Sequence, residues 1–501
     1  MQLRNLTTLL FASFSGKLVY AMASLAALPL ATRLLGAEAM GMVGFFTTLL
    51  MVLMVAEGGL TSNIIHRMAR SVAVSPQKAR RNRAADLSMV SSYFATFTLI
   101  GAIAFLGVGL ASGFMAEHWL SIEDVGKAAA RQSLWYMAGF IALNFPIMLL
   151  QAVLAGKEMQ LALNALYVPY SLLRTLGVLL PLYLFPGMRS IEFYFLLQVI
   201  VQVSYLLALL WVVHGKTGFL PWLYRFKMGY LRRGYVYGRG VLLISITSVL
   251  TTQYDKLYLS GRITLEAFGY YTLATTLAGV AYIFSTAFNS VLFPRMAACF
   301  SANDERSVER IHTASLCIMS SVLVLLCCAV VLFKPLVLGI LFAPDVAAGV
   351  SSVVGILVVG TSLQSLLIVP FALQLATKWT TLAFRLNVVA IPLMLLGLPL
   401  LVERWGSNGA AWMWLLYNIY SVLLTFFFVC KRHPYLTKGV FTGLKVLAMS
   451  ITAGVVFFAA ANAVCERLVS DYYRLGVVVV ATVVAVLASL VLNRKSLLAF
   501  R

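Results

Sequence analysis

Charged residues are scarce in this sequence. Asp, Glu, Lys and Arg make up 11% of the 501 residues, whereas soluble domains usually carry about 25%. Hydrophobic residues make up 61% and recur in long runs throughout the chain. This composition excludes a single-span or peripheral protein and predicts a polytopic membrane protein.

The motifs of soluble enzymes are also missing. There is no Walker loop, no GxGxxG opening a helix, no HExxH and no GxSxG. The sequence therefore predicts no catalytic residues and no cofactor. A membrane glycosyltransferase or ligase would need a clustered site in a sizeable outer loop, and the longest such loop, about 113–128, is short.

Acidic residues and cysteines are few as well. There are 17 Asp and Glu against 38 Lys and Arg, a net charge of +21, and the six cysteines show no metal-ligand spacing. In a soluble protein such a charge would indicate nucleic acid. Here long apolar spans interrupt the basic runs, so we expect no nucleic-acid partner and no metal site.

Spanning helices need roughly 20 apolar residues each, and on that rule the chain contains about fourteen. The predicted spans are 6–31, 40–65, 87–112, 129–155, 161–185, 191–213, 238–260, 267–293, 313–338, 347–376, 380–402, 409–430, 441–463 and 475–492. Basic residues concentrate in alternate loops, such as 66–83 and 214–240. By the positive-inside rule both termini are predicted to be cytoplasmic.

One stretch of the chain is repeated. At an offset of 228 residues, 38–69 matches 266–297 without gaps, and 11 of the 32 pairs are identical. The copies lie six predicted spans apart, so they run parallel. We therefore predict two parallel six-helix lobes in a V-shaped arrangement. The N-lobe covers 1–213, a cytoplasmic linker 214–237, the C-lobe 238–430, and two appended helices with a tail 431–501.

Two cations lie deep within predicted spans, Lys17 and Arg174. Intramembrane charges are costly and usually face a polar cavity. Each lies on a polar stripe at helical spacing, so we expect a cationic, substrate-binding cavity. The polar residues expected to line it are Ser13, Tyr20, Ser24, Asn164, Tyr167, Ser171, Thr252, Asp255, Thr275, Tyr282 and Asn289. The alternative is that the cations pair with carboxylates and the other stripes bond helix to helix.

Carboxylates near the spans are the candidates for ion coupling. Glu57 is the deepest by hydropathy, although Gly58 and Gly59 can open the helix beside it. Asp255 is the second candidate, but it adjoins Lys256 and can simply pair with it. Coupling to an H⁺ or Na⁺ gradient through either residue is one possibility, and structural pairing is the other.

Three segments of the chain resemble a known family. LPLATRLLGAEAMG with EGGL and HRMAR, YDKLYLSGRITLEAFGYYTLATTL with FPRMA, and RWGSNGAAWMWLL resemble bacterial polysaccharide transporters of the O-antigen (Wzx-type) flippase type. These belong to the multidrug/oligosaccharidyl-lipid/polysaccharide exporter (MOP) superfamily. The resemblance spans roughly residues 1–430.

The resemblance implies a multi-pass transporter of the bacterial inner membrane. Its substrate would be an undecaprenyl-pyrophosphate-linked glycan of O-antigen, lipopolysaccharide, capsule or exopolysaccharide biosynthesis, moved by alternating access. A polysaccharide polymerase and chain-length proteins are implied as partners, besides membrane lipids. In such a protein, Lys17 and Arg174 would bind the pyrophosphate.

Two alternatives belong to the same superfamily. A lipid II-type flippase is disfavoured because the first span lacks an Arg-Asp pair and contains Lys17 alone. A multidrug or cation-coupled exporter should line its cavity with acids, whereas the deep charges here are mostly cationic.

Overall fold

The computed structural model describes residues 22–72, 76–220, 226–377, 379, 381–468 and 470–492. Within them, twelve helices are long and apolar enough to cross a membrane, or thirteen when the bent pair 228–235 and 240–260 is included. These correspond to the second to fourteenth predicted spans. The first predicted span is described only from Met22, in the helix Met22–Leu35. The predicted all-α polytopic fold is confirmed.

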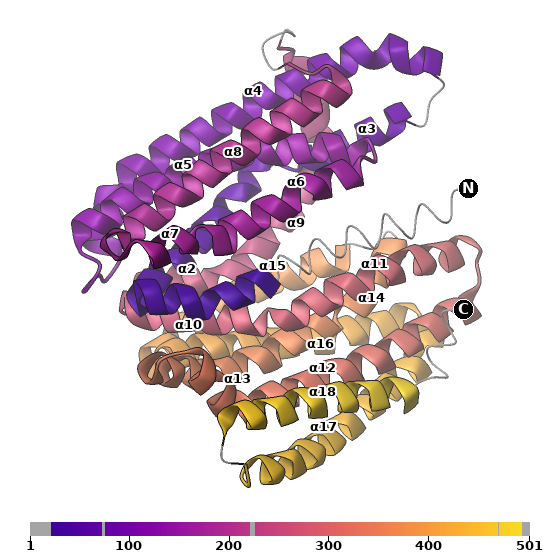
Figure 1. The fold of residues 1–501 in the computed structure, drawn as a ribbon. Coiled ribbons are helices and arrows are strands. Elements are labelled where there is room, and N and C mark those ends of the chain that lie inside the picture. Colours follow the sequence, from indigo (N-terminus) through magenta and orange to yellow (C-terminus); the bar gives the residue numbers. More distant parts are fainter. Residues whose placement is uncertain are drawn as a thin grey trace. The chain divides into compact units, whose positions relative to one another are not determined.

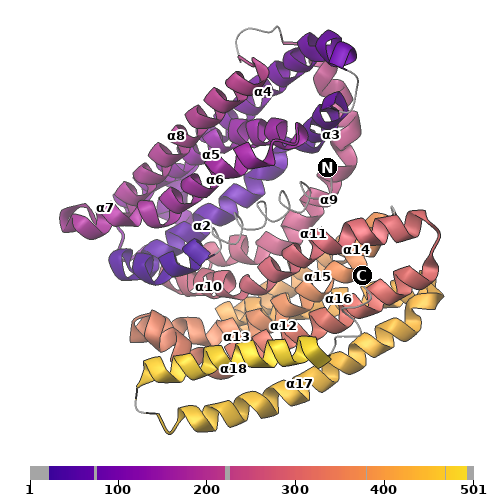
Figure 2. The same cartoon turned by 45° about the vertical axis from the view of Figure 1, so that its right-hand side comes forward.

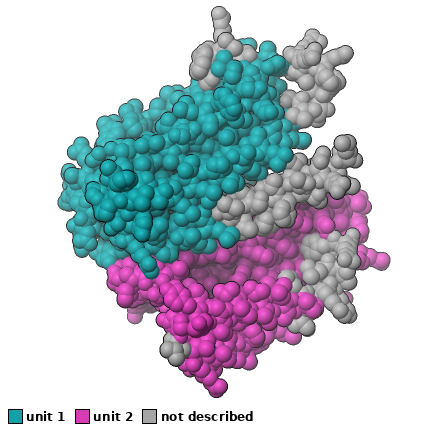
Figure 3. Space-filling model, viewed as in Figure 1, with its two compact units in different colours: residues 1–269 teal, residues 270–501 magenta. Residues whose placement is uncertain are grey.

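The chain divides into two compact units, Met1–Gly269 and Tyr270–Arg501 (Figure 3). The helices that begin in unit 1 are α2 (Ala37–Met54), η1 (Val55–Glu57), α3 (Leu60–Val72), α4 (Pro76–Phe114), η2 (Met115–Trp119), α5 (Lys127–Gly156), α6 (Gln160–Leu172), η3 (Leu173–Gly177), α7 (Leu179–Leu184), η4 (Pro186–Met188), α8 (Ile191–Thr217), α9 (Met228–Ser260) and α10 (Leu265–Ala278). Among them, α4, α5 and α8 run side by side (Figure 1).

Unit 2 is built around one long helix. Its elements are α11 (Val280–Ser301), α12 (Glu305–Leu341), α13 (Pro344–Leu366), α14 (Ile368–Ala376), α15 (Thr381–Trp405), α16 (Ser407–Arg432), η5 (Pro434–Leu436), α17 (Thr437–Cys465) and α18 (Asp471–Leu492). Residues 314–325 of α12 are all buried, as expected of a helix that is apolar all round. Both α17 and α18 lie against it (Figures 1 and 2).

The second predicted span is broken by glycines. After α2 the chain makes the short turn η1, and Gly58 and Gly59 take the left-handed φ values of 66° and 74°, which glycine adopts without strain. Gly59 also lies against the backbone of Gly238: a Cβ at position 59 would be 2.7 Å from the carbonyl oxygen of Gly238. Gly238 lies where α9 bends by 63°, so the two interrupted helices meet at glycine backbones.

The two copies of the repeat meet at their shared glycine. A Cβ on Gly41 would lie 2.1 Å from the carbonyl oxygen of Leu265, and one on Gly269 would lie 2.3 Å from that of Ala37. Adding 228 to Ala37 and Gly41 gives Leu265 and Gly269. The contacts are therefore reciprocal, and all four residues belong to unit 1. Glycine is needed at both positions because the backbones touch.

Helix α9 packs on unit 1, although the sequence analysis assigned it to the C-lobe. Its last residue, Ser260, accepts a hydrogen bond of 3.0 Å from the indole nitrogen of Trp119. The amide of Leu265 donates to the carbonyl of Ser121 at 3.0 Å. The lobe limits at 213 and 238 stay a prediction. A lobe is a group of helices that move together, and a compact unit need not coincide with such a group.

Glu38, which is identical in both copies of the repeat, fixes the loop between η2 and α5. Its buried carboxylate accepts hydrogen bonds of 2.6, 2.6 and 2.7 Å from the amides of Glu123, Asp124 and Val125. Hydrogen bonds to a charged acceptor are about twice as strong as neutral ones. One side chain therefore satisfies three successive donors.

We predict that Glu38→Gln lowers the free energy of unfolding by about 2 kcal/mol, because the amides lose a charged acceptor. Thermal unfolding of the detergent-purified protein measures the change. Glu117→Gln is the matched control, since Glu117 is exposed on the neighbouring η2, and it should change stability little. Equal stability of the two variants would contradict the role given to Glu38.

We predict that Gly41→Ala and Gly269→Ala each destabilise the protein by about 1–3 kcal/mol, since each methyl group would overlap a backbone carbonyl. The reciprocal geometry requires the two losses to be similar. Gly107→Ala is the control, because nothing lies within 4 Å of a Cβ at that helical position; it should be neutral or stabilising. Thermal unfolding again provides the measurement, and a harmless change at either contact glycine would argue against the crossing.

Candidate functional site

Three of the predicted cavity residues, Ser13, Lys17 and Tyr20, lie outside the described residues. Their neighbour Ser24 is described, and its hydroxyl is buried without a hydrogen-bond partner among the described residues. The cationic cavity is therefore assessed from Arg174 and its surroundings.

Arg174 lies in a π-helical turn, η3, within the span that includes α6 and α7. In this turn the amide of Val178 donates to the carbonyl of Leu173 at 2.9 Å, one residue further back than in an α-helix. The carbonyl of Arg174 instead accepts a bond of 3.1 Å from Nε2 of Gln198. The π turn thus offers Gln198 a backbone acceptor at the arginine itself.

Gln198 and Phe140 contact the Arg174 side chain. Its Nε donates to Oε1 of Gln198 at 3.3 Å, and its guanidinium carbon lies 4.6 Å from the centre of the Phe140 ring. Gln198 is buried, whereas Arg174 is only half-buried. An amide and an aromatic face thus orient the guanidinium within the span.

A ladder of hydrogen bonds continues from this point through unit 1. Tyr170 donates to Gln202 at 2.5 Å, Gln202 to Asn144 at 3.2 Å, and Asn144 to the sulfur of Met54 at 3.0 Å. Beside it, Gln151 donates to the hydroxyl of Tyr205 at 3.0 Å. The buried polar stripe of α8 therefore joins helices, as polar residues in membranes commonly do.

The sequence analysis missed the residues of α5 in this network. Phe140, Asn144 and Gln151 are spaced by four and seven residues, so they lie on one face of the helix. Two amides at that spacing in an otherwise apolar span were the available signal.

The polar residues of α6 have separate roles. The buried hydroxyl of Ser171 donates to the carbonyl of Val168 at 2.8 Å, within its own helix. The Tyr167 and Tyr170 ring centres lie 6.2 Å apart. The side-chain nitrogen of Asn164 is buried and has no hydrogen-bond partner in the described part of the chain. Of these, Asn164 is the residue with unused hydrogen-bonding capacity.

Glu57 caps a helix. Its carboxylate accepts hydrogen bonds from both the amide, at 3.0 Å, and the hydroxyl of Thr61 in the first turn of α3. A carboxylate at a helix N-terminus also interacts favourably with the helix dipole. The helix break at Gly58 and Gly59 creates this end, so the geometry favours structural pairing over ion coupling.

Asp255 is paired with its neighbour. It is buried, and Nζ of Lys256 lies 3.3 Å from its carboxylate and donates to the carbonyl of Thr252 at 3.0 Å. The Thr252 hydroxyl bonds to the carbonyl of Ser248 at 2.8 Å. The pairing of Asp255 with Lys256, which the sequence analysis gave as the alternative to ion coupling, is therefore present.

The remaining predicted lining residues lie in unit 2. Thr275 donates to the carbonyl of Tyr271 at 2.8 Å, while Tyr282 is 47% exposed. The side-chain oxygen of Asn289 is buried and has no hydrogen-bond partner among the residues described. The structure therefore leaves Tyr282 exposed, whereas Thr275 is bonded within its own helix.

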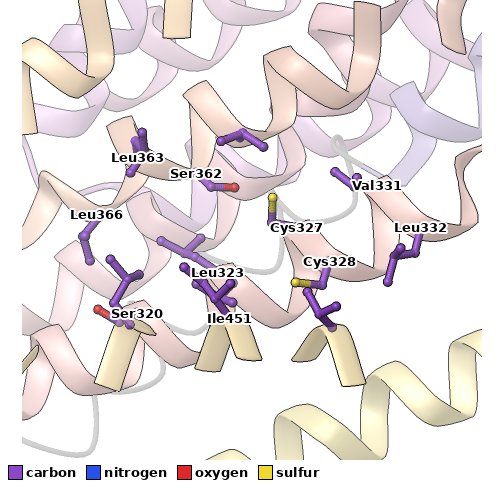
Figure 4. A pocket seen from close by; sticks show the side chains of 14 residues that line it. Ser320, Leu323, Cys327, Cys328, Val331, Leu332, Ser362, Leu363, Leu366 and Ile451 are labelled. Carbon is purple, nitrogen blue, oxygen red and sulfur yellow. The ribbon is translucent and has the colours of Figure 1, made fainter. Parts of the chain in front are cut away.

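Unit 2 also contains an apolar pocket between α12, α13 and α17 (Figure 4). Its volume is about 350 Å³, and its lining is almost entirely hydrocarbon with the thiols of Cys327 and Cys328. Such a lining suits a hydrocarbon chain and excludes a charged group. Within the described ranges, no three His, Cys, Asp or Glu residues are grouped to hold a metal ion.

No protein-family model matches this sequence, and no curated protein matches it. Solved structures do. A multidrug resistance MATE family transporter of the MOP superfamily, in an inward-facing conformation, has a TM-score of 0.69 at 13% identity and covers 84% of this chain and 96% of its own.

Two further structures match over most of the chain. The lipid II flippase MurJ, in an inward closed conformation, has a TM-score of 0.67 at 13% identity and covers 98% of this chain and 99% of its own. A MOP superfamily transporter from Pyrococcus furiosus, described as having a binding pocket of reverse polarity, has a TM-score of 0.53 at 15% identity over 85% of this chain and 95% of its own. The chain therefore has the fold of MOP-superfamily transporters.

Proposed function

We propose that this protein is a flippase for a polyprenyl-pyrophosphate-linked oligosaccharide in the bacterial inner membrane. The cargo is a repeat unit of a surface polysaccharide, and the protein moves it by alternating access without catalysing a reaction or using a cofactor. A polysaccharide polymerase and chain-length proteins are the proposed partners.

The observation that carries this proposal is the environment of Arg174. Gln198 and Phe140 hold a half-buried guanidinium inside a span. Guanidinium groups bind phosphate oxygens through paired, charge-assisted hydrogen bonds. A pyrophosphate cannot enter hydrocarbon unaided, and a cation at this depth replaces part of its hydration.

Two further features support a lipid-linked cargo. The apolar pocket of unit 2 suits a hydrocarbon chain. In addition, the match to the MurJ flippase extends over 98% of the chain, whereas the MATE transporter leaves 16% uncovered. The uncovered part of this chain is similar in length to residues 431–501, which contain the appended helices α17 and α18.

The alternatives within the superfamily differ in cargo. A lipid II-type flippase would bind the same pyrophosphate, so Arg174 serves it equally well. A multidrug exporter coupled to H⁺ or Na⁺ needs an acidic site, but Asp255 is paired with Lys256 and Glu57 caps α3. Arg174 thus favours an anionic cargo over a cationic one.

Deletion of the gene tests the cargo. A polysaccharide flippase predicts loss of a surface polysaccharide, with single lipid-linked repeat units retained on the cytoplasmic side. A lipid II flippase predicts retained lipid II and cell lysis instead. Normal surface glycan and normal lipid II, in a strain without a second flippase, would refute both.

We predict that Arg174→Gln reduces export by about 10- to 100-fold, which corresponds to the loss of one or two charge-assisted hydrogen bonds. Arg174→Lys should retain part of the activity, because it keeps the charge but not the planar donor group. Lys17→Ala is expected to reduce export similarly. Export is measured in the deletion strain complemented with each variant.

Arg189→Gln is the control for these variants. Arg189 is exposed and bonds to the carbonyls of Leu182 and Tyr183 near the end of the same span. This variant should export normally. Thermal unfolding separates loss of binding from loss of folding, and a stable Arg174→Gln protein with normal export would exclude the proposed phosphate site.

A further inference from the structure

A fully buried histidine lies in unit 2, outside the site described above. His312, near the start of α12, is 0% exposed. Neither Nδ1 nor Nε2 has a hydrogen-bond partner among the described residues. A neutral imidazole carries one donor and one acceptor, so both are unsatisfied here. Such orphaned groups in a protein interior require an explanation.

Apolar side chains surround this position. The cluster at this end of unit 2 draws residues from six helices and a turn, including Met296, Val308, Ile311, Leu373, Val429, Leu436 and Val440. Burying a polar group without a partner costs about 1–3 kcal/mol, and a cluster of this kind could take an aliphatic side chain at no such cost. The histidine is therefore a poor choice for packing alone.

The turn between α16 and α17 closes this end of the cluster. His433 lies in it, with its ring centre 6.3 Å from that of Trp379 and 5.6 Å from that of Tyr435. The turn leads into Gly439, where a Cβ would lie 1.9 Å from the hydroxyl oxygen of Thr313. The start of α17 therefore packs on the residue next to His312.

The segments around His312 carry several titratable groups. His433 of the turn is the group whose charge acts on it. Burial lowers the pKa of His433, Arg432 lowers it further and Glu305 opposes both. Further titratable or charged groups on the described segments at this end are Arg306, Glu309 and Arg310 of α12, Arg295 and Cys299 of α11, Cys430, Lys431 and Arg432 of α16, Tyr435 of η5 and Lys438 of α17.

We propose that His312 is a proton-binding site whose protonation opens the turn between α16 and α17. In the closed arrangement the ring is fully buried and has no acceptor among the described residues, so a charge on it would be costly. The uncharged ring therefore belongs to the closed arrangement. Opening the turn hydrates the ring and lets it accept one proton.

The direction of the pH effect follows from linkage. A hydrated histidine has an ordinary pKa near 6.5. Above that pH both arrangements hold a neutral ring, so the closed one is fully favoured. Below it only the open arrangement gains a proton, and the ratio of closed to open falls about tenfold per pH unit. This site provides a proton-dependent step whatever cargo the protein carries.

Hydrogen–deuterium exchange of the purified full chain tests the proposal, with rates corrected for the intrinsic pH dependence of exchange. Peptides covering 305–316 and 431–443 should keep their protection between pH 8 and 7. They should lose it about fivefold between pH 6.5 and 5.5. In His312→Gln the pH dependence should disappear.

Two matched variants serve as controls. His433→Gln should keep a pH dependence, because His312 still gains its proton only in the open arrangement. His214→Gln should behave as the parent, since the ring nitrogen of His214 already bonds to the carbonyl of Phe219 at 3.2 Å. Protection that is independent of pH in the parent, or equally pH-dependent in His312→Gln, overturns the proposal.

A second measurement covers the case in which His312→Gln does not fold. In the parent protein labelled at its five histidines, the His312 signal in NMR spectra should titrate together with the loss of protection at 431–443. A His312 signal that titrates near pH 6.5 while the turn stays protected also overturns the proposal.

Discussion

Water is absent from the hydrocarbon core of a membrane, so polar groups there must be satisfied within the protein. This constraint explains the helical architecture and the hydrogen bonds of unit 1. Tyr170, Gln202 and Asn144 satisfy one another across α6, α8 and α5. Where the helix itself departs from regular geometry, at the π turn of Arg174, the freed carbonyl is taken up by Gln198. The proposed phosphate site is thus built on a backbone irregularity that a neighbouring amide stabilises.

Close contact between helix backbones is the second feature on which the structure depends. Gly41 and Gly269 let the two copies of the repeat cross, and Gly59 and Gly238 let two interrupted helices meet. Small residues serve this purpose in membranes, where helix association depends on close packing rather than on the hydrophobic effect. The residues shared by the copies, such as Glu38 and Gly41, are architectural, whereas Arg174 lies outside the repeat. Architecture and proposed substrate chemistry therefore use different residues.

Ionisable groups fall into three kinds in this protein. Glu57 and Asp255 are engaged locally, one by a helix end and one by Lys256. Arg174 is oriented by Gln198 and Phe140, and its guanidinium suits an anionic ligand. His312 is buried with no hydrogen-bond partner among the described residues, which suits a proton. The sequence analysis named the first two kinds, but it overlooked the third because a single histidine at the end of an apolar span carries no pattern.

The sequence alone determined the all-α membrane architecture, because span length and hydrophobicity follow directly from the thickness of the hydrocarbon core. It also revealed the repeat and the depth of Arg174, since both follow from the order of residues along the chain. Only the tertiary structure decided which polar stripes bond between helices. Glu57 looked like an ion-coupling residue by its depth and Ser171 like a cavity residue by its spacing, yet each is satisfied within its own segment. Helical periodicity shows which side chains share a face, but the neighbour that meets that face is decided by the packing of residues far apart in the chain.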